Sequence, residues 1–160
     1  MSSEQVVGMT NNDIIELVQL LIPQGKFDGV VRKDQLKING PGHFAIVNLE
    51  NTGKGNGTHW VACGFAEKKP WYFDSFGLGV PEEINKVLGA ESEIAHCLLQ
   101  IQSDSSSLCG LFAVGSCCVG ASATESSVSS KLNQFVHMFS NEPNLLKNDE
   151  KIKKFIRQRM

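Results

Sequence analysis

The sequence lacks the features that mark several large classes of protein. No apolar run approaches the roughly 20 residues of a membrane helix, so we expect a soluble protein. Residues 1–5 have no basic start and no long apolar core follows them, which argues against a secretory signal. The 15 Lys and Arg residues nearly balance the 17 Asp and Glu residues, and the net charge of −2 does not favour nucleic-acid binding by the chain as a whole.

The cysteines also lack a recognisable scaffold pattern. There are five of them, an odd number, and their spacing matches neither a disulfide framework nor a zinc site. His96 and Cys97 are adjacent, but no second pair at zinc-like spacing accompanies them, so we expect no metal. We therefore expect free thiols in an intracellular, reducing compartment. With 160 residues, 41% of them hydrophobic, the chain is long enough for a single domain over residues 1–160.

One stretch, residues 102–112, joins a polar half to an apolar half. Its serines and Asp104 disfavour a helix interior, whereas the chain from Gly110 to Val119 has hardly a polar group. The apolar run is typical of a buried helix, although periodicity alone does not exclude a buried strand. In a helix, Cys109 lies in the first turn, where unpaired N–H groups and the dipole stabilise a thiolate. By itself, a cysteine before such a run is most often a core residue.

Two further residues turn Cys109 into a candidate nucleophile. His59 and Asp74 lie on short runs that are typical of neighbouring strands. A neutral histidine can take the thiol proton, and an acid partner holds the imidazole in the required tautomer. Gln102 precedes Cys109 by seven positions, so its side-chain amide and the Cys109 backbone N–H can both donate to an oxyanion.

The pattern of the whole chain predicts an α+β fold, a small mainly antiparallel sheet flanked by helices, with the nucleophile at the N-terminus of a buried central helix. Strands at 44–47, 58–65 and 71–74 form an antiparallel meander, which brings His59 and Asp74 side by side. We further expect a fourth strand at residues 94–101 and an irregular segment at residues 27–37. Residues 1–9 are expected to form a loose N-terminus, and residues 51–57 a hairpin-like loop. Helices are predicted near residues 12–22, 81–88, 109–120, 132–139 and 149–157.

The order and spacing of these residues resembles one known family. His59-Trp60, then the Phe-Asp-x-Phe-Gly of residues 73–77, then the Gln-x6-Cys-Gly-Leu-Phe of residues 102–112, is similar to the adenovirus protease (adenain) family of cysteine endopeptidases. More distantly it resembles the ubiquitin-like-protein-specific proteases of the same superfamily. The resemblance covers roughly residues 10–155, and the Gln-to-Cys spacing fits adenain better than its deconjugating relatives.

The resemblance implies a role for each of these residues. Cys109 is the nucleophile, His59 is the base and then the acid, and Asp74 orients His59. Adenain itself has Glu at this position, and its deconjugating relatives have Asp. Gln102 and the Cys109 N–H hold the oxyanion, and Trp60 forms a wall of the substrate site. The implied substrates are viral structural precursors cleaved at Gly-containing sites, in the host nucleus and in the virion.

The resemblance also bears on cofactors and partners. The chemistry needs no cofactor, but the family is activated by a short peptide through a disulfide to a cysteine upstream of the glutamine. Cys97, five residues before Gln102, is the candidate here. The family also uses DNA through a basic surface. Only residues 147–160, with six Lys and Arg against two acidic residues, offer such a surface, and a solvated basic helix is the simpler interpretation. We expect a monomer.

Three alternative functions remain open on the sequence. The first is a protease that deconjugates a ubiquitin-like modifier, and the second is a catalytically silent binding or capsid-associated protein with this fold. The third is DNA binding alone. The other histidines, His43 and His137, have no apparent partner in the sequence and are expected to be structural.

Overall fold

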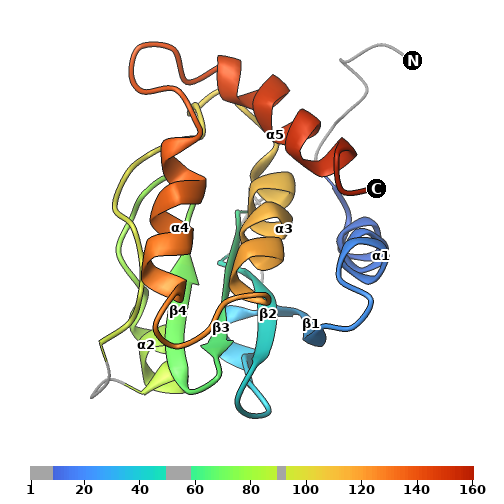
Figure 1. Ribbon diagram of the computed structural model, residues 1–160, viewed down its shortest axis with the longest axis vertical. Coiled ribbons are helices and arrows are strands. Elements are labelled where there is room, and N and C mark those ends of the chain that lie inside the picture. Colours follow the sequence, from blue (N-terminus) through green and yellow to red (C-terminus); the bar gives the residue numbers. More distant parts are fainter. Residues whose placement is uncertain (1–8, 50–58, 90–92) are drawn as a thin grey trace.

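A four-stranded sheet with helices against both of its faces forms the framework (Figure 1). The computed structural model describes residues 9–49, 59–89 and 93–160. The strands lie in chain order across the sheet, with β1 parallel to β2 and the pairs β2–β3 and β3–β4 antiparallel. Their bounds are β1 Lys26–Arg32, β2 His43–Asn48, β3 Trp60–Ala66 and β4 Lys69–Phe73. The predicted α+β class with a mainly antiparallel sheet is confirmed.

Both faces of the two central strands are buried, which explains their continuous apolar sequences. Successive strand residues point to opposite faces. Phe44 and Ile46 of β2 lie in a cluster with the central helix, while Ala45 and Val47 lie in a second cluster on the other side. A strand that is covered on both faces has no solvent-exposed side, so its sequence is apolar throughout and does not alternate with polar residues.

Five helices are present in the described chain. Four of them, α1, α3, α4 and α5, contribute to the larger hydrophobic cluster, and α2 covers the opposite face of the sheet (Figure 1). Their bounds are α1 Asn11–Leu21, α2 Glu82–Leu88, α3 Cys109–Gly120, α4 Val128–His137 and α5 Lys147–Arg157. None of the described helices has the length and apolar character to cross a membrane.

Helix α3 is the central helix, and glycines let its neighbours come close. It contacts β3, α1, α4 and α5. A Cβ on Gly120 would lie 2.5 Å from the Trp71 ring of β4, and one on Gly115 would lie 3.0 Å from both Phe135 and Ile152. Side chains at these positions would push the helix away from the sheet and from its helical neighbours. The helix is therefore buried on nearly all sides, as its apolar sequence predicts.

Two sequence predictions about strands are wrong. The segment expected to be irregular, 27–37, begins with β1, and the predicted fourth strand at 94–101 is absent from the described structure. This segment makes one bridge, in which Ala95 N–H donates to Pro70 O at 2.9 Å and Tyr72 N–H donates to Ala95 O at 2.8 Å. β4 ends at Phe73, two residues beyond the bridged Trp71, so little strand edge remains with which residues after Ala95 could pair.

Other predicted boundaries differ by a few residues. Pro81 precedes α2 as its N-cap instead of starting it, and Thr10 caps α1 in a reciprocal box with Asp13. Met9 is described and packs against the larger cluster. The rest of the loose N-terminus and the hairpin-like loop at 51–57 lie outside the described residues.

Candidate active site

The candidate nucleophile is the first residue of the central helix. Cys109 is 5% exposed and begins α3, and the N-cap residue Leu108 provides no side-chain cap. The first N–H groups of a helix have no partner within the helix itself. The thiol therefore lies where the positive end of the helix dipole favours negative charge, as the sequence predicts.

The predicted His59–Asp74 pair is present where β3 begins and β4 ends. His59 immediately precedes β3 and Asp74 immediately follows β4, and the antiparallel pairing of the two strands brings these ends together. His59 Nε2 lies 2.7 Å from Asp74 Oδ1, which also accepts the Phe76 N–H at 2.8 Å. The Asp74 side chain is 1% exposed, so its charge is compensated by these donors and not by bulk water.

The second nitrogen of His59, Nδ1, is buried. The ring also interacts with the Cys109 thiol. Burial of the ring disfavours the imidazolium, but the hydrogen bond to Asp74 and the interaction with the Cys109 thiol outweigh it and raise the pKa of His59 to about 9. His59 is therefore coupled on one side to a carboxylate and on the other to the candidate nucleophile.

Phe76 completes the immediate surroundings of the imidazole. Its ring centroid lies 4.5 Å from that of His59, with 31° between the ring planes. A ring in this tilted contact limits rotation of the imidazole. The sequence motif contains Phe76, but no role for it follows from the sequence.

Gln102 is buried, and its amide orientation is determined by its neighbours. The Ser75 hydroxyl donates to Oε1 at 2.5 Å, and Nε2 donates to the Ser106 carbonyl at 3.0 Å. A flipped amide would place its oxygen against that carbonyl, so only this orientation is favourable. Nε2 also approaches Ser106 Oγ at 3.4 Å, a longer and weaker contact than the one to the carbonyl.

The two other predicted site residues are Trp60 and Cys97. Trp60 is 4% exposed and belongs to the same hydrophobic cluster as Cys109, so its role as a substrate wall stays a prediction. Cys97 is half-buried, and its Sγ lies 4.0 Å from Asn133 Oδ1 on α4. None of the five cysteines forms a disulfide, and no group of three or more metal-ligating side chains occurs in the described residues.

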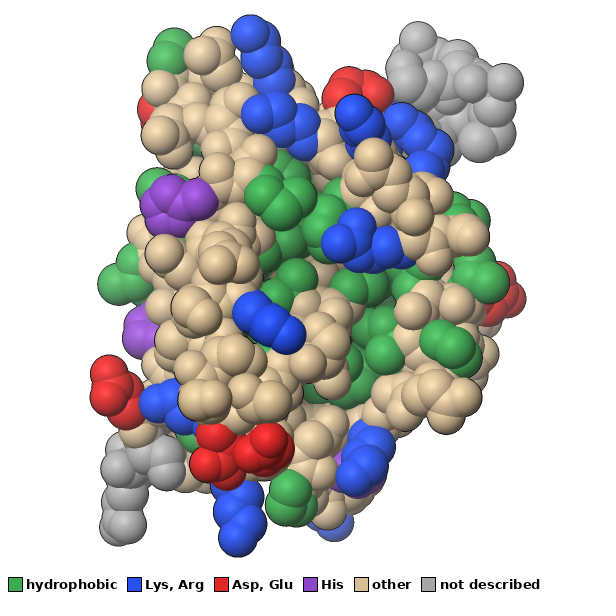
Figure 2. Space-filling model, viewed as in Figure 1, with side chains coloured by type: hydrophobic (Ala, Val, Ile, Leu, Met, Phe, Trp, Pro, Cys, Tyr) green, Lys and Arg blue, Asp and Glu red, His purple; other side chains and the backbone are tan. Residues whose placement is uncertain are grey.

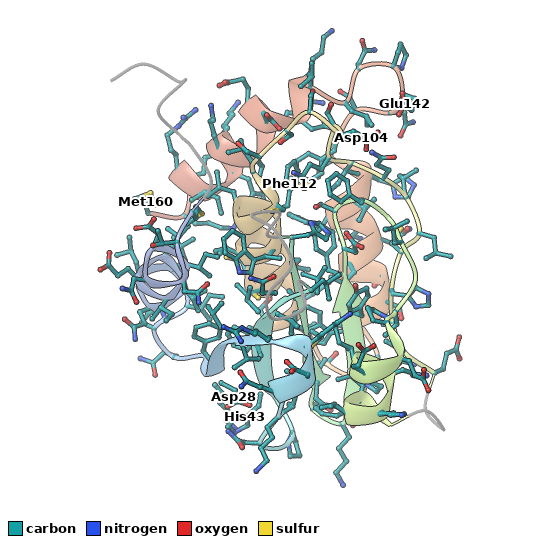
Figure 3. All side chains as sticks on the ribbon, turned by 180° about the vertical axis from the view of Figure 1, so that it is seen from behind. Asp28, His43, Asp104, Phe112, Glu142 and Met160 are labelled. Carbon is teal, nitrogen blue, oxygen red and sulfur yellow. The ribbon has the colours of Figure 1, made fainter. Side chains whose placement is uncertain are left out.

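The expectation that His43 has no partner is wrong. Its Nδ1 lies 2.8 Å from Asp28 Oδ1, and the two side chains lie side by side near the start of β2 (Figure 3). Asp28 also accepts the backbone N–H and the side-chain amide of Asn39, each at 2.8 Å. The pair joins β1 to the chain that leads into β2, which is the structural role that the sequence predicts for His43.

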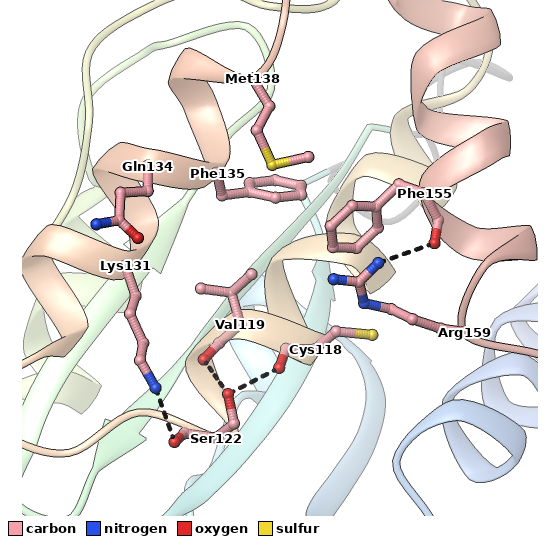
Figure 4. A pocket seen from close by; sticks show the side chains of 9 residues that line it. All are labelled: Cys118, Val119, Ser122, Lys131, Gln134, Phe135, Met138, Phe155 and Arg159. Atoms are coloured by element: carbon pink, nitrogen blue, oxygen red, sulfur yellow. Dashed lines mark hydrogen bonds between the residues drawn. The ribbon is translucent and has the colours of Figure 1, made fainter.

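A cavity of about 260 Å³ between α3, α4 and α5 is separate from this site (Figure 4). It is lined by Cys118 and Val119, at the end of α3 opposite to Cys109. The nine positions between Cys109 and Cys118 correspond to about 14 Å of helix. Lys and Arg side chains gather over α5 above this cavity (Figure 2), in agreement with a basic C-terminal helix.

Fold and geometry together define a Cys-His-Asp arrangement with an ordered glutamine amide in an α+β domain. A scan against protein-family models gives no match, and a search of curated proteins finds no relative of this chain.

Proposed function

We propose that this protein is a cysteine peptidase. The observation that supports the proposal is the position of His59, whose Nε2 is held by Asp74 while its buried Nδ1 side is coupled to Cys109 at the start of α3. A thiol, an imidazole and a carboxylate in this order are the groups that nucleophilic cleavage of an amide requires.

The first half of the reaction forms a thioester. With a pKa near 9, His59 carries a proton at neutral pH. The proposed nucleophile is the Cys109 sulfur after its proton has passed to the imidazole. The sulfur attacks the scissile carbonyl carbon, and the carbonyl oxygen becomes an oxyanion. His59 then donates its proton to the amide nitrogen, the C–N bond breaks, and the amine product leaves.

The second half of the reaction restores the enzyme. Neutral His59 takes a proton from water, the hydroxide attacks the thioester carbonyl, and the C–S bond breaks to release the acid. The weakly bonded second N–H of Gln102 Nε2 and the Cys109 backbone N–H donate to the oxyanion in both halves. Asp74 keeps Nε2 of His59 protonated and stabilises the imidazolium.

The particular enzyme that we propose is an adenain-like endopeptidase that cleaves viral precursor proteins at Gly-containing sites. The support for this finer assignment is the sequence resemblance, above all the Gln-x6-Cys-Gly-Leu-Phe motif. The fold is compatible with it, because the motif spans the turn from the buried Gln102 into the central helix.

The direct test compares two cysteines of the same helix. We expect hydrolysis of Gly-containing peptides by the native protein, and a loss of about 10⁴-fold or more in Cys109→Ala. Cys118→Ala, which removes a half-buried free thiol at the other end of α3, is expected to retain activity within about twofold, since this thiol lies outside the site. Equal activity of the native protein and Cys109→Ala would exclude the proposal.

Further substrates separate the alternatives. Preferential hydrolysis of a ubiquitin-like fluorogenic substrate would favour a deconjugating protease. Failure of Cys109 to react with iodoacetamide, together with no hydrolysis, would favour a catalytically silent protein. Salt-dependent DNA affinity that survives Cys109→Ala would favour DNA binding through residues 147–160. Stimulation by an added peptide that is lost in Cys97→Ser would support the activating disulfide.

A further inference from the structure

The first turn of α5 holds the loop that carries the oxyanion residues. Asn148 is fully buried, and its Nδ2 donates to the carbonyl of Ile101 at 2.8 Å and to that of Ser140 at 2.9 Å. Its Oδ1 accepts the Ser140 N–H at 2.7 Å. Every polar atom of the side chain is thus engaged, and one of its contacts is to the residue immediately before Gln102.

The next residue of α5 holds the other end of the same loop. The Ser106 hydroxyl donates to Asp149 Oδ1 at 2.7 Å and accepts the Leu108 N–H at 3.2 Å. The carbonyl of Ser106 is also the acceptor for Gln102 Nε2. Ser106 therefore connects Asp149 both to the oxyanion glutamine and to the residue that precedes Cys109.

These contacts determine where the Gln102 amide lies. The loop between Gln102 and Leu108 contains four serines and an aspartate, and such residues do not define one backbone conformation by themselves. On the strand side, Ser75 holds Gln102 through its hydroxyl and through its carbonyl, which accepts the Gln102 N–H at 3.0 Å. On the loop side, the corresponding anchor is the Ser106–Asp149 hydrogen bond, to which Asn148 adds a second attachment.

We propose that Asn148 and Asp149 are positioning residues of the oxyanion site, which they hold through Ile101 and Ser106. This inference rests on the proposed peptidase function. It makes α5 part of the catalytic unit, although the helix is more than 30 residues away from Cys109 in the sequence. Because the oxyanion exists only after attack, misplacement of Gln102 lowers kcat and leaves KM nearly unchanged.

Asp149 is the better residue for the test, because loss of Asn148 would leave three buried backbone groups unpaired and endanger the fold. In Asp149→Ala we expect kcat to fall roughly 10- to 100-fold, less than for the loss of an oxyanion donor itself. Asp149→Asn keeps an oxygen that can accept the Ser106 hydroxyl, so it should retain most of the activity. Glu150→Gln, a change in the adjacent and largely exposed carboxylate, is the matched control and should retain full activity.

A second reagent distinguishes positioning of the oxyanion site from damage to the nucleophile. Iodoacetamide reacts with a thiolate by displacement at carbon and forms no oxyanion. Its rate with Cys109 should stay within about twofold in Asp149→Ala. A parallel fall in alkylation and kcat would overturn the proposal, and so would an unchanged kcat in a variant whose only defect is a lower free energy of unfolding.

The link from Asp149 through Ser106 to Gln102 can also be measured if no peptidase activity is found. Equal peptide hydrolysis by the native protein and Cys109→Ala would exclude the proposed function. The side-chain amide signals of Gln102 in NMR spectra would still report the hydrogen bond to Ser106. We expect Asp149→Ala to shift these signals and to speed their exchange with water, whereas Glu150→Gln should change neither. Unchanged Gln102 signals in Asp149→Ala would refute the positioning role.

Discussion

Two histidine–aspartate pairs of this protein are similar in sequence separation and in N···O distance, and differ in their surroundings. Each joins residues 15 positions apart, with an N···O distance of 2.7 Å for His59–Asp74 and 2.8 Å for His43–Asp28. Asp28 is further held by two donors from Asn39. Asp74 receives one N–H besides His59, and its Oδ2 is buried with no partner in the described chain.

The second ring nitrogen makes the larger difference. In His59 it is buried and the ring is coupled to the Cys109 thiol, whereas the contact of the His43 ring in the described residues is with a carboxylate that holds two chain segments together. Whether a histidine–carboxylate pair can take part in proton transfer to or from a nucleophile therefore depends on the group beside the second ring nitrogen. The pair at His43 serves as an internal control for the pair at His59.

The largest contrast is expected from removal of the two imidazoles. His59→Ala should lower kcat/KM by about 10³-fold or more, because the proton acceptor and donor is lost. His43→Ala should keep kcat/KM within about twofold, since its pair lies outside the reacting groups. Steady-state hydrolysis of a Gly-containing peptide measures both. Comparable losses in the two folded variants would break the distinction between the pairs.

Removal of the charge on the two carboxylates should also lower kcat/KM at the His59 pair and not at the His43 pair. Asp74→Asn no longer stabilises the imidazolium, and we expect a fall in kcat/KM of roughly 10²-fold or more. Asp28→Asn should leave kcat/KM unchanged. The same peptide assay applies, with circular dichroism to verify that both variants are folded, and a silent Asp74→Asn would contradict the role assigned to this carboxylate.

The pH dependence of stability follows from the raised pKa of His59. A group whose pKa rises on folding stabilises the protein fully below its unfolded value of 6.5, and this contribution is lost as the pH rises through about 9. The shift corresponds to a contribution on the order of 3 kcal/mol to the free energy of unfolding. Urea unfolding below pH 6.5 and above pH 9 should show this decline in the native protein.

Asp74→Asn provides the control for that measurement. It removes the main partner that raises the pKa of His59, so the decline with pH should be smaller in this variant. An NMR titration of the His59 ring should give a midpoint near 9 in the native protein and a lower one in Asp74→Asn. A native midpoint near 6.5 would contradict the coupling.

The smallest effect is expected at the structural pair. The hydrogen bonds from Asn39 and His43 lower the pKa of Asp28 against the opposing effect of burial, so their stabilisation is present above the ordinary value of 3.8 and is lost as the pH falls through the lower folded value. Asp28→Asn should reduce the free energy of unfolding at neutral pH by about 1 kcal/mol. Thermal unfolding measures it, with Asp34→Asn as an exposed control for the loss of one charge.

Much of the candidate site could be predicted because its members lie in patterned stretches. The apolar run after residue 109 predicts the central helix with the bounds that the structure has. The antiparallel order of β3 and β4 predicts that His59 and Asp74 meet, because strand ends are neighbours in such a pair. The predicted strand at 94–101 is wrong, because strand formation depends on the partner edge and β4 ends at Phe73, two residues beyond the bridged Trp71.

The tertiary contacts of Asn148 and Asp149 could not be predicted from the sequence. Both residues lie in a charged stretch whose composition is typical of a solvated helix face. Asn148 nevertheless is fully buried, and its partners are Ile101 and Ser140. The Asp28–His43 pair was missed because β1 was not predicted as a strand, so no pattern placed Asp28 beside β2.

By itself the sequence determined the helices, the three-stranded meander and the order of candidate groups along the chain, because hydrophobic periodicity and capping act between residues that are near in sequence. Only the tertiary structure decided that His43 pairs with Asp28, and which helix supports Gln102. Those choices depend on side-chain hydrogen bonds across buried interfaces, whose geometry is defined by the packing of whole elements and not by any local pattern.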